Sequence, residues 1–289
     1  MSSDVRVALV TYQGLKDLNA DDRLAAAALA DIGLPTDPVC WDDPTVDWLA
    51  YKAVVLRSTW DYQHRVAEFH AWIDRMEAIG AHVWNPPQVL RWNTDKRYLA
   101  RRWHPQLSPP PTTILDRQSK VDLRALLETH GWDEAVLKPT ISADGQSTER
   151  TSRADAALNQ AALDTLLLQH DVIVQQLVPE IRSSGEISLM FFGGAFSHAV
   201  SKRPRAGEFR VQERLGGAIA RTDPPSALVS CARAMLDEHA PGCLYARVDV
   251  VVTAERFILM EIELVEPSLY LAYDPPSALA FALAVRRIT

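Results

Sequence analysis

Strand and helix patterns alternate through residues 1–88, and this alternation restricts the fold more than any other feature. The apolar run VRVALVTY predicts a buried strand, and NADDRLAAAALADIG predicts a helix that Asn19 caps and Gly33 follows. KAVVLRS predicts a second strand, followed by an amphipathic helix from about His64 to Ile79. Because strands that alternate with helices pair in one direction, the pattern predicts an α/β fold with a parallel sheet.

Polar residues follow the second of these strands. Ligands of parallel sheets bind beyond the carboxyl ends of the strands, which places the stretch RSTWDY at the ligand edge. Arg57 is the candidate there for a substrate carboxylate, because a guanidinium matches a carboxylate in shape and charge. The alternative is an ordinary arginine at a strand end that forms a surface salt bridge.

The rest of the chain reads as two further lobes. A strand AVLKP, the polar loop TISADGQSTER, a helix and the strand DVIVQQLV form the second, and GEISLMFFGGAFSHAV opens the third as a hairpin with a glycine turn. A loop, a helix and a last hairpin complete the chain. The expected division is an N-terminal α/β substrate-side domain (1–88), a linker helix (89–112), a central lid domain (113–182) and a C-terminal domain (183–289).

Charge, cysteines and the first residues narrow the function classes. The formal net charge of -7 comes with both signs interspersed, so no face for nucleic acid or membrane is indicated and the expected partner is a small molecule. The N-terminal residues show no secretory pattern, which favours a cytoplasmic protein. The 3 cysteines lack CxxC spacing, so we expect reduced core thiols and no zinc site.

Three carboxylates converge near the C-terminal end. The stretch LYARVDVVVTAERFILMEIEL predicts two strands with a turn near Glu255, which sets Asp249 opposite Glu261 and puts Glu263 on the same face. The opposite face is then wholly apolar, with Val248, Val250, Val252, Ile258, Met260 and Ile262. Converging carboxylates raise each other's pKa unless a cation lies among them. Oxygen ligands of this kind suit Mg2+, with Mn2+ as the alternative metal, and a solvated acidic face is the reading without a metal.

A magnesium site suggests a nucleotide, yet the sequence contains neither GxxxxGKS/T nor GxGxxG after a strand. Phosphates must then be held by other groups. Lys96 and Lys138 are the candidates. The loop after Lys138 adds Ser142 and Gly145, whose backbone N–H groups suit phosphate oxygens.

The order of these features resembles the ATP-grasp ligases. Lys96, then VLKP with a small-residue loop, IVQQLV, GEISLMFFGGAFSHAVSKRPRAGEFRVQERLGG, RVD and MEIE follow one another as in that family. The segment from GEISL is most similar to RimK-type glutamate ligases and bacterial glutathione synthetases. The resemblance implies three lobes, with ATP bound between the central and C-terminal lobes.

The resemblance also implies residue roles. Lys96 and Lys138 bind ATP phosphates beneath a lid around Gly145, and Asp249, Glu261 and Glu263 bind two Mg2+ ions. The hinge offers adenine backbone groups of Gln175, Gln176 and Leu177, while Glu186 holds the ribose. The groups that face the transferring phosphate and the substrate carboxylate are Lys202, Arg210 and Arg247.

Three departures from the family pattern stand out. Glu263 occupies the position of asparagine in the usual E-x-N, which adds a negative charge at the metal site. Arg210 and Gln212 stand where RimK-type enzymes have R-x-N. The lid loop is poor in glycine.

The implied reaction is that of a carboxylate–amine ligase. ATP phosphorylates a carboxylate, and a nitrogen then displaces phosphate from the acyl phosphate to form an amide. LRSTWDYQHR, VWNPPQVLRWNTDKRYL and ELVEPSLYL resemble the branch that includes the cycloserine-forming synthetase, which implies cyclisation of O-ureido-D-serine, with Ser268 near the acyl acceptor.

Two alternatives stay open: an intermolecular amino-acid or peptide ligase, and a nucleotide-binding protein without chemistry. Of the histidines, His198 alone is expected near the site, and a structural role is favoured for it. Trp60, Trp84 and Trp92 are expected to pack between lobes.

Overall fold

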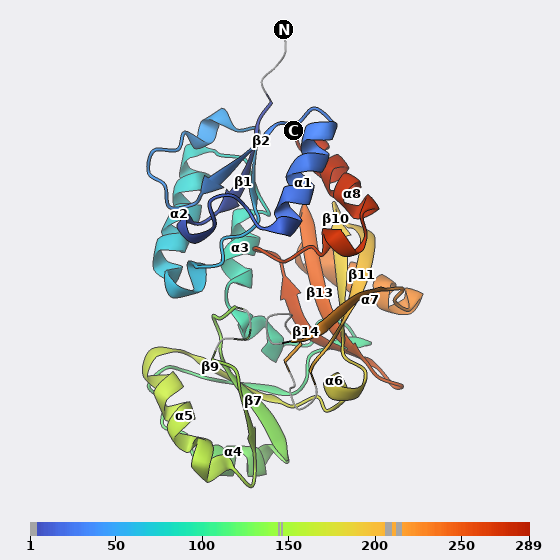
Figure 1. Ribbon diagram of the computed structural model, residues 1–289. Helices are drawn as coiled ribbons and strands as arrows, with labels where there is room; N and C mark the ends of the chain where they lie inside the picture. Colours follow the sequence, from blue (N-terminus) through green and yellow to red (C-terminus); the bar gives the residue numbers. More distant parts are fainter. Residues whose placement is uncertain (1–4, 144, 146, 206–209, 212–215) are drawn as a thin grey trace.

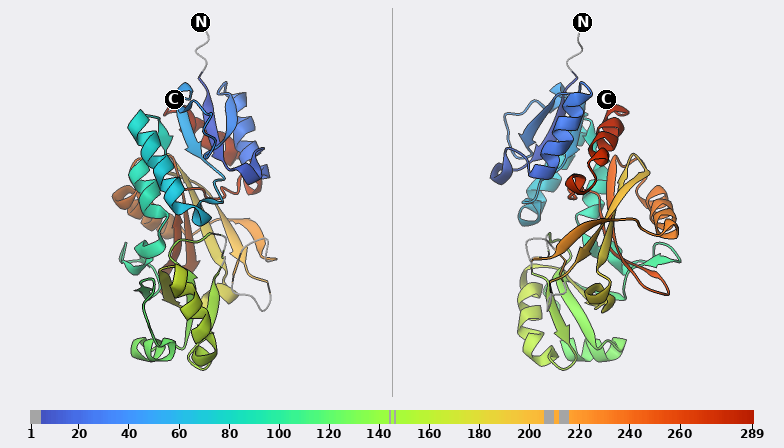
Figure 2. Two further views of the ribbon diagram at one scale, coloured as in Figure 1. Left: turned by 90° about the vertical axis from the view of Figure 1, so that its left-hand side faces the viewer. Right: turned by 45° about the vertical axis from the view of Figure 1, so that its right-hand side comes forward.

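The computed structural model describes residues 5–143, 145, 147–205, 210–211 and 216–289. The described residues form three sheets, with strand orders β2-β1-β3-β4, β6-β9-β7-β8 and β12-β11-β10-β13-β14-β5. The first and second sheets lie at opposite ends of the molecule and the third lies between them (Figure 1; Figure 2). The described residues contain no helix long and apolar enough to cross a membrane.

The elements of the first part of the chain are β1 (Val7–Thr11), α1 (Ala20–Asp31), β2 (Thr36–Cys40), β3 (Ala53–Leu56), α2 (Val66–Ile79), β4 (Val83–Trp84), α3 (Pro87–Asn93), β5 (Leu107–Ser108), β6 (Thr112–Leu115), α4 (Leu123–His130), β7 (Glu134–Pro139), β8 (Glu149–Ser152), α5 (Ala156–Gln169) and β9 (Val172–Gln176). The later elements are α6 (Glu180–Ser183), β10 (Glu186–Phe192), β11 (Ala195–Arg203), β12 (Ala218–Thr222), α7 (Ser226–His239), β13 (Tyr245–Val252), β14 (Phe257–Glu263) and α8 (Pro276–Arg286).

The first sheet is parallel, as the alternation predicts: β1 pairs in parallel with β2 and β3, and β3 with β4. Asn19 caps α1 by accepting a hydrogen bond from the Asp22 N–H, and Gly80 ends α2 in the left-handed conformation. β2 was not predicted. It contains Pro38, a residue that sheets accept at an edge, and β2 is indeed the edge strand.

The third sheet collects strands from distant parts of the chain. β10 and β11 form the predicted hairpin, and both turn glycines, Gly193 and Gly194, have positive φ. β5, within the segment expected to be a linker helix, pairs in parallel with β14. β8 lies where a loop was expected, and antiparallel pairing with β7 holds it.

The expected last hairpin is β13–β14, and a C-terminal helix that was not predicted, α8, follows it and ends the chain. Figure 1 shows α8 beside α1. Its side chains Phe281 and Val285 share one buried cluster with Leu9 and Leu29 of the first domain. The end of the chain therefore completes the core of its beginning, so the proposed division at residue 88 does not separate two independent cores.

Asn85 joins the first domain to the third sheet. Its buried amide donates to the carbonyls of Tyr245 at 2.9 Å and Leu264 at 2.7 Å, and its oxygen accepts from the Leu244 N–H at 2.7 Å. A buried amide satisfied by main-chain groups fixes two segments relative to each other. This contact sets the position of the chain that leaves β14.

Two of the three tryptophans pack as expected. Trp92 lies 5.3 Å from Tyr98 and 5.5 Å from Trp103 between ring centroids, and Trp84 packs against the core that the first domain shares with α8. Trp60 differs because it lines the cavity described below. The three cysteines were expected to be core thiols: Cys231 is buried, whereas Cys40 and Cys243 are only partly buried.

Candidate active site

One cavity of about 660 Å3 brings together residues of the second and third sheets and residues that follow the strands of the first sheet. Every expected site residue lines it except Arg57. The residues that line it as expected are Lys96, Lys138, Ser142, Gly145, Gln175, Gln176, Leu177, Glu186, Lys202, Arg210, Arg247, Asp249, Glu261, Glu263 and Ser268. Gln212, expected to replace the asparagine of R-x-N, lies outside the described residues.

The three carboxylates meet as the strand pattern predicts. Asp249 on β13 lies opposite Glu261 on β14, and one carboxylate oxygen from each of Asp249, Glu261 and Glu263 lies within 4.8 Å of the others. Oxygens this close form a donor set that suits a hard divalent cation.

The predicted apolar back face is wrong in part. The register of β13 and β14 shifts between Asp249 and Val250, so Met260 becomes the extra residue of a bulge and lines the cavity. Ile258 accordingly packs with Val251 in a small cluster beside the cavity. A bulge reverses the faces of the residues beyond it, which alternation alone cannot show.

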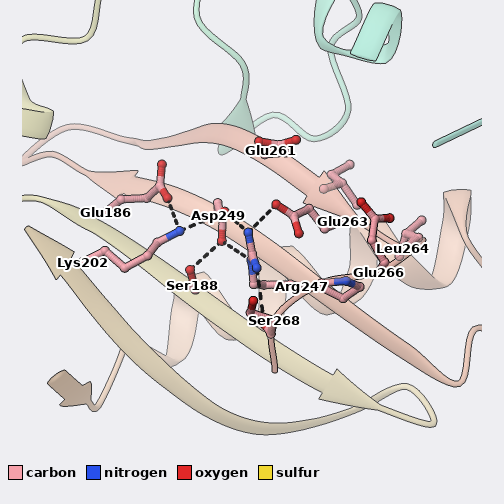
Figure 3. A network of polar contacts seen from close by, with 12 residues as sticks. Glu186, Ser188, Lys202, Arg247, Asp249, Glu261, Glu263, Leu264, Glu266 and Ser268 are labelled. Carbon is pink, nitrogen blue, oxygen red and sulfur yellow. Dashed lines mark hydrogen bonds and ion pairs between the residues drawn. The ribbon is translucent and has the colours of Figure 1, made fainter. Parts of the chain in front are cut away.

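Arg247 holds two of the carboxylates together. Its Nε and Nη2 lie 3.1 Å from the two oxygens of Asp249, and Nη2 also pairs with Glu263 (Figure 3). The Ser188 hydroxyl donates to Asp249 at 2.6 Å. Burial opposes ionisation, yet Arg247 and Lys202 hold the pKa of Asp249 below its ordinary value. Asp249 is therefore a fixed negative charge.

Lys202 is the second buried cation. Its Nζ lies 3.1 Å from Asp249 and also pairs with Glu186, the expected ribose ligand. Despite burial, the charges of Asp249 and Glu186 raise the pKa of Lys202. Glu186 is thus already paired in the protein, and a ribose would have to share it with Lys202.

The two candidate phosphate lysines differ in their surroundings. Lys96 is buried, lies 3.1 Å from Glu261 and donates to the Ser142 carbonyl of the lid loop. Burial lowers the pKa of Lys138, and Glu261 opposes this effect. Both ammonium groups lie on the same cavity as the acidic cluster, as a phosphate site requires.

The expected hinge, residues 175–177, makes hydrogen bonds within the protein. The N–H groups of Gln176 and Leu177 donate to the carbonyls of Pro111 at 2.9 Å and Glu134 at 3.1 Å. The Gln175 amide donates to Thr112 at 2.8 Å. Two of the backbone N–H groups of the expected hinge are therefore already hydrogen-bonded within the protein. The apolar wall was missed by sequence reasoning; it consists of Val136, Val178, Ile181, Val211 and Met260.

Arg57 is the expected site residue that the structure places elsewhere. It is 1% exposed, its Nε pairs with Asp22 at 3.0 Å, and its Nη2 donates to the Pro267 carbonyl at 2.7 Å. It is neither a substrate ligand nor the surface salt bridge of the alternative reading. Asp22 neutralises the charge of Arg57 inside the domain interface. Arg57 therefore influences the cavity through its hydrogen bond to the Pro267 carbonyl, which helps to position the chain there.

The segment 264–269 after β14, which we call the clamped segment, is held by its main chain. Every carbonyl from residue 264 to 268 accepts a side-chain hydrogen bond. The donors are Asn85 to Leu264, Tyr245 to Val265, Trp60 to Glu266, Arg57 to Pro267 and Arg247 to Ser268. Asp21 of α1 accepts from the Leu269 N–H at 3.1 Å. The first domain and β13 together thus fix the cavity wall that carries Glu266 and Ser268.

His198 is a structural residue, as favoured above. It is buried, and its Nε2 lies 2.9 Å from the Leu269 carbonyl at the end of the clamped segment. Its Nδ1 lies 3.0 Å from the Ser197 hydroxyl.

Glu266 is a cavity residue that the sequence analysis missed. It lies just beyond the strand that carries Glu261 and Glu263 (Figure 3). No hydrogen-bond donor or ion-pair partner among the described residues contacts its carboxylate. Burial, and then the charge of Glu263, raise the pKa of Glu266 to about 8. Burial likewise raises the pKa of Glu263 to about 7, against the opposing charge of Arg247.

The raised pKa of Glu266 predicts that the difference in stability between Glu266→Gln and the wild type depends on pH. Above about pH 4.5 the carboxyl loses its proton in the unfolded chain, while the folded protein keeps it up to about pH 8. Stability is therefore lost as the pH rises through this window, and a glutamine at the position avoids the loss. The full pKa difference corresponds to about 5 kcal/mol at about 1.36 kcal/mol per pH unit. Solvent access reduces this to on the order of 2 kcal/mol.

Urea denaturation in EDTA at pH 5, 6, 7 and 8 measures this difference. We expect the free energy of unfolding of Glu266→Gln, relative to the wild type, to increase steadily across the series. A difference that stays constant from pH 5 to pH 8 would contradict the raised pKa. Glu255→Gln, an exposed carboxylate in the turn between β13 and β14, is the control.

Known proteins match the chain in two parts. The N-terminal domain of D-cycloserine synthetase DcsG matches residues 7–85, and the ATP-grasp domain of prokaryotic glutathione synthetase matches residues 97–270. The cycloserine biosynthesis protein DcsG of Streptomyces lavendulae is 32% identical over 96% of this chain and 97% of its own length. A glutathione synthetase of Xylella fastidiosa (strain 9a5c) is 33% identical over 49% of this chain and 43% of its own length.

Solved structures agree with these matches. The crystal structure of D-cycloserine synthetase DcsG is similar with a TM-score of 0.85 and 30% identity, over 98% of this chain and 100% of that one. A RimK domain ATP-grasp protein from Sphaerobacter thermophilus has a TM-score of 0.70 at 20% identity, over 97% and 98% of the two chains. The D-alanine–D-alanine ligase of Bacillus anthracis has a TM-score of 0.67 at 14% identity and covers 98% of both. The last two likenesses concern the fold alone.

Proposed function

The chain belongs to the ATP-grasp ligases of the prokaryotic glutathione synthetase family, and from this premise we propose that it cyclises O-ureido-D-serine to D-cycloserine. Members of this family use ATP and a divalent metal ion, and they form carbon–nitrogen bonds. The observation that carries the proposal is the likeness to cycloserine synthetase over both the substrate-side domain and the ATP-grasp domain. A cytoplasmic location, where ATP is available, is part of the proposal.

ATP would lie in the cavity between the central and third sheets. Its purine would meet the apolar wall of Val136, Val178 and Met260, and its phosphates would lie toward Lys96 and Lys138. An apolar slot beside buried cations suits a nucleotide, because the base prefers an apolar surface and the phosphates require positive charge.

The acidic cluster fits a metal ion by the chemistry of its donors. Asp249, Glu261 and Glu263 would hold Mg2+, which usually binds a few carboxylates together with substrate phosphates. The metal would neutralise charge on the phosphate oxygens during transfer. Glu263 adds a charge that the common asparagine lacks, and Arg247 offsets this charge in the protein.

The reaction has two steps. A substrate carboxylate oxygen attacks the γ-phosphorus of ATP and ADP leaves, with Arg247 and Lys202 stabilising the charge that develops. The substrate's own oxygen-linked nitrogen then attacks the acyl carbon, loses its proton and expels phosphate, which closes a five-membered ring. The carbamoyl group remains on that nitrogen, and its hydrolysis to carbon dioxide and ammonia completes the conversion.

The test is ADP release with ATP, Mg2+ and O-ureido-D-serine as the single carboxylate, followed by mass analysis. Turnover with this compound alone and a product of the mass of cycloserine, or of its carbamoyl derivative, is expected. Turnover that requires a second free amine would replace the proposal with an intermolecular amino-acid or peptide ligase. Nucleotide binding without ADP release for any carboxylate, alone or with an added amine, would favour a non-catalytic protein.

A further inference from the structure

Glu266 is a carboxylate that the reaction above does not use. Two cations that lower the pKa of Glu266 are already paired: Lys96 with Glu261, and Arg247 with Asp249 and Glu263. Glu263 and Glu261 act on it in the opposite sense, because both are negative and raise its pKa. A carboxylate held in a cavity among like charges lacks a cationic partner, and a ligand can supply one.

The position of Glu266 is rigidly set. Trp60 Nε1 donates to the Glu266 carbonyl at 3.1 Å, and the neighbouring carbonyls of Val265 and Pro267 accept bonds from Tyr245 and Arg57. Pro267 further restricts the backbone of the residue before it. Such support on both sides is typical of a residue that must present one side chain to a ligand.

Two aromatic side chains share the cavity with this carboxylate. Trp60 and Tyr62 line the same cavity. Burial raises the pKa of the Tyr62 phenol, and among charged groups Glu266 contributes most to that rise. An acid beside aromatic rings recognises an organic ammonium group, which gains both an ion pair and a cation–π contact. Among the described residues, the acids whose oxygens lie close enough together to hold a metal ion are Asp249, Glu261 and Glu263, and Glu266 does not belong to that group.

We propose that Glu266, beside Trp60 and Tyr62, binds the ammonium group of an amino-acid substrate and determines specificity for it. This inference rests on the proposed function, in which the carboxylate of the same amino acid faces Arg247. The geometry is compatible with one small molecule, because Arg247 Nη1 lies 3.3 Å from the Ser268 carbonyl, two residues beyond Glu266. An α-amino acid carries its carboxylate and ammonium on one carbon atom.

A comparison of two substrates and two proteins tests the assignment. The substrates are O-ureido-D-serine and its analogue without the amino group, 3-(ureidooxy)propanoic acid, and the proteins are the wild type and Glu266→Gln. In the wild type we expect kcat/KM to be about 100-fold lower for the analogue. In Glu266→Gln we expect the two substrates to differ less than threefold, and the analogue to react as it does with the wild type.

Persistence of the 100-fold preference in Glu266→Gln would overturn the proposal. An equal loss for both substrates would do so too, because it would indicate a general base. Lower Mn2+ affinity of the variant in the absence of amino acid would indicate a metal ligand and also overturn it. Glu266→Ala serves as a second variant with the same expectation, and thermal unfolding verifies that each variant is folded.

Failure of the proposed function gives a separate result. If the wild type releases no ADP with O-ureido-D-serine, the cyclisation proposal fails. ADP release is then measured in the presence of an added amine, comparing alanine with propanoate and serine with 3-hydroxypropanoate. The ammonium site is supported if the wild type requires the amino group of the substrate and Glu266→Gln does not. Equal use of acids with and without the amino group, or no use of any amino acid, overturns it.

Discussion

Replacing Glu261 with glutamine is expected to lower the rate of ADP release at least about 1000-fold. Glu261 belongs to the three carboxylates whose oxygens lie within 4.8 Å of one another, and it also pairs with Lys96. A glutamine keeps the shape but removes the charge that, under the proposed function, holds a divalent ion. Stabilisation of the transferring phosphate by such an ion is worth several kcal/mol. About 4 kcal/mol corresponds to the expected factor.

The measurement is steady-state ADP release with saturating ATP, amino acid and Mg2+, together with Mn2+ binding followed by electron paramagnetic resonance. We expect Mn2+ affinity in the presence of ATP to fall in parallel with turnover. Glu255→Gln removes an exposed carboxylate from the turn of the same hairpin and should leave both quantities unchanged. ADP release by Glu261→Gln at the wild-type rate would remove Glu261 from the metal site.

Arg247→Lys is expected to lower kcat by about 100- to 1000-fold although the positive charge remains. The guanidinium binds both oxygens of Asp249 at 3.1 Å, reaches Glu263 and donates to the Ser268 carbonyl. A lysine ammonium cannot reproduce this fork. Loss of one aligned donor to a developing negative charge typically costs this much in rate.

Separate values of kcat and of KM for ATP and for the amino acid distinguish this effect from weaker nucleotide binding. We expect kcat to carry most of the loss and KM for ATP to change little. Arg233→Lys, on an exposed face of α7, is the matched control. A variant with kcat within threefold of the wild type would show that Arg247 only balances the charge of its two carboxylate partners.

The acidic cluster could be predicted because the pairing of β13 and β14 is regular at Asp249 and Glu261. A turn near Glu255 and a period of two residues set Asp249 opposite Glu261. The bulge beyond that pair could not be predicted, since no residue type requires it, and Met260 consequently faces the cavity. Local pattern thus predicted which acids converge, but it did not predict the shape of the wall beside them.

Arg57 and Glu266 show the other limit of sequence reasoning. Arg57 follows a parallel strand at the ligand edge, as the general rule requires, but the first domain packs against the clamped segment and buries it with Asp22. Glu266 was within reach of sequence reasoning, because it stands between the strand that carries Glu261 and Glu263 and a proline. Only the three-dimensional arrangement reveals that its carboxylate has no hydrogen-bond or ion-pair partner in the part of the chain that the structure describes.

The clamped segment has a consequence for how such an enzyme can change its substrate. The groups that hold it bind carbonyl oxygens, which every amino acid possesses, so Glu266 and Ser268 can be exchanged without removing any of these supports. A mutation at either position can therefore change which substrate is bound without changing the hydrogen bonds that position the segment. Natural variation, or a library built at these two positions, could then explore new amino acids one replacement at a time on an unchanged scaffold.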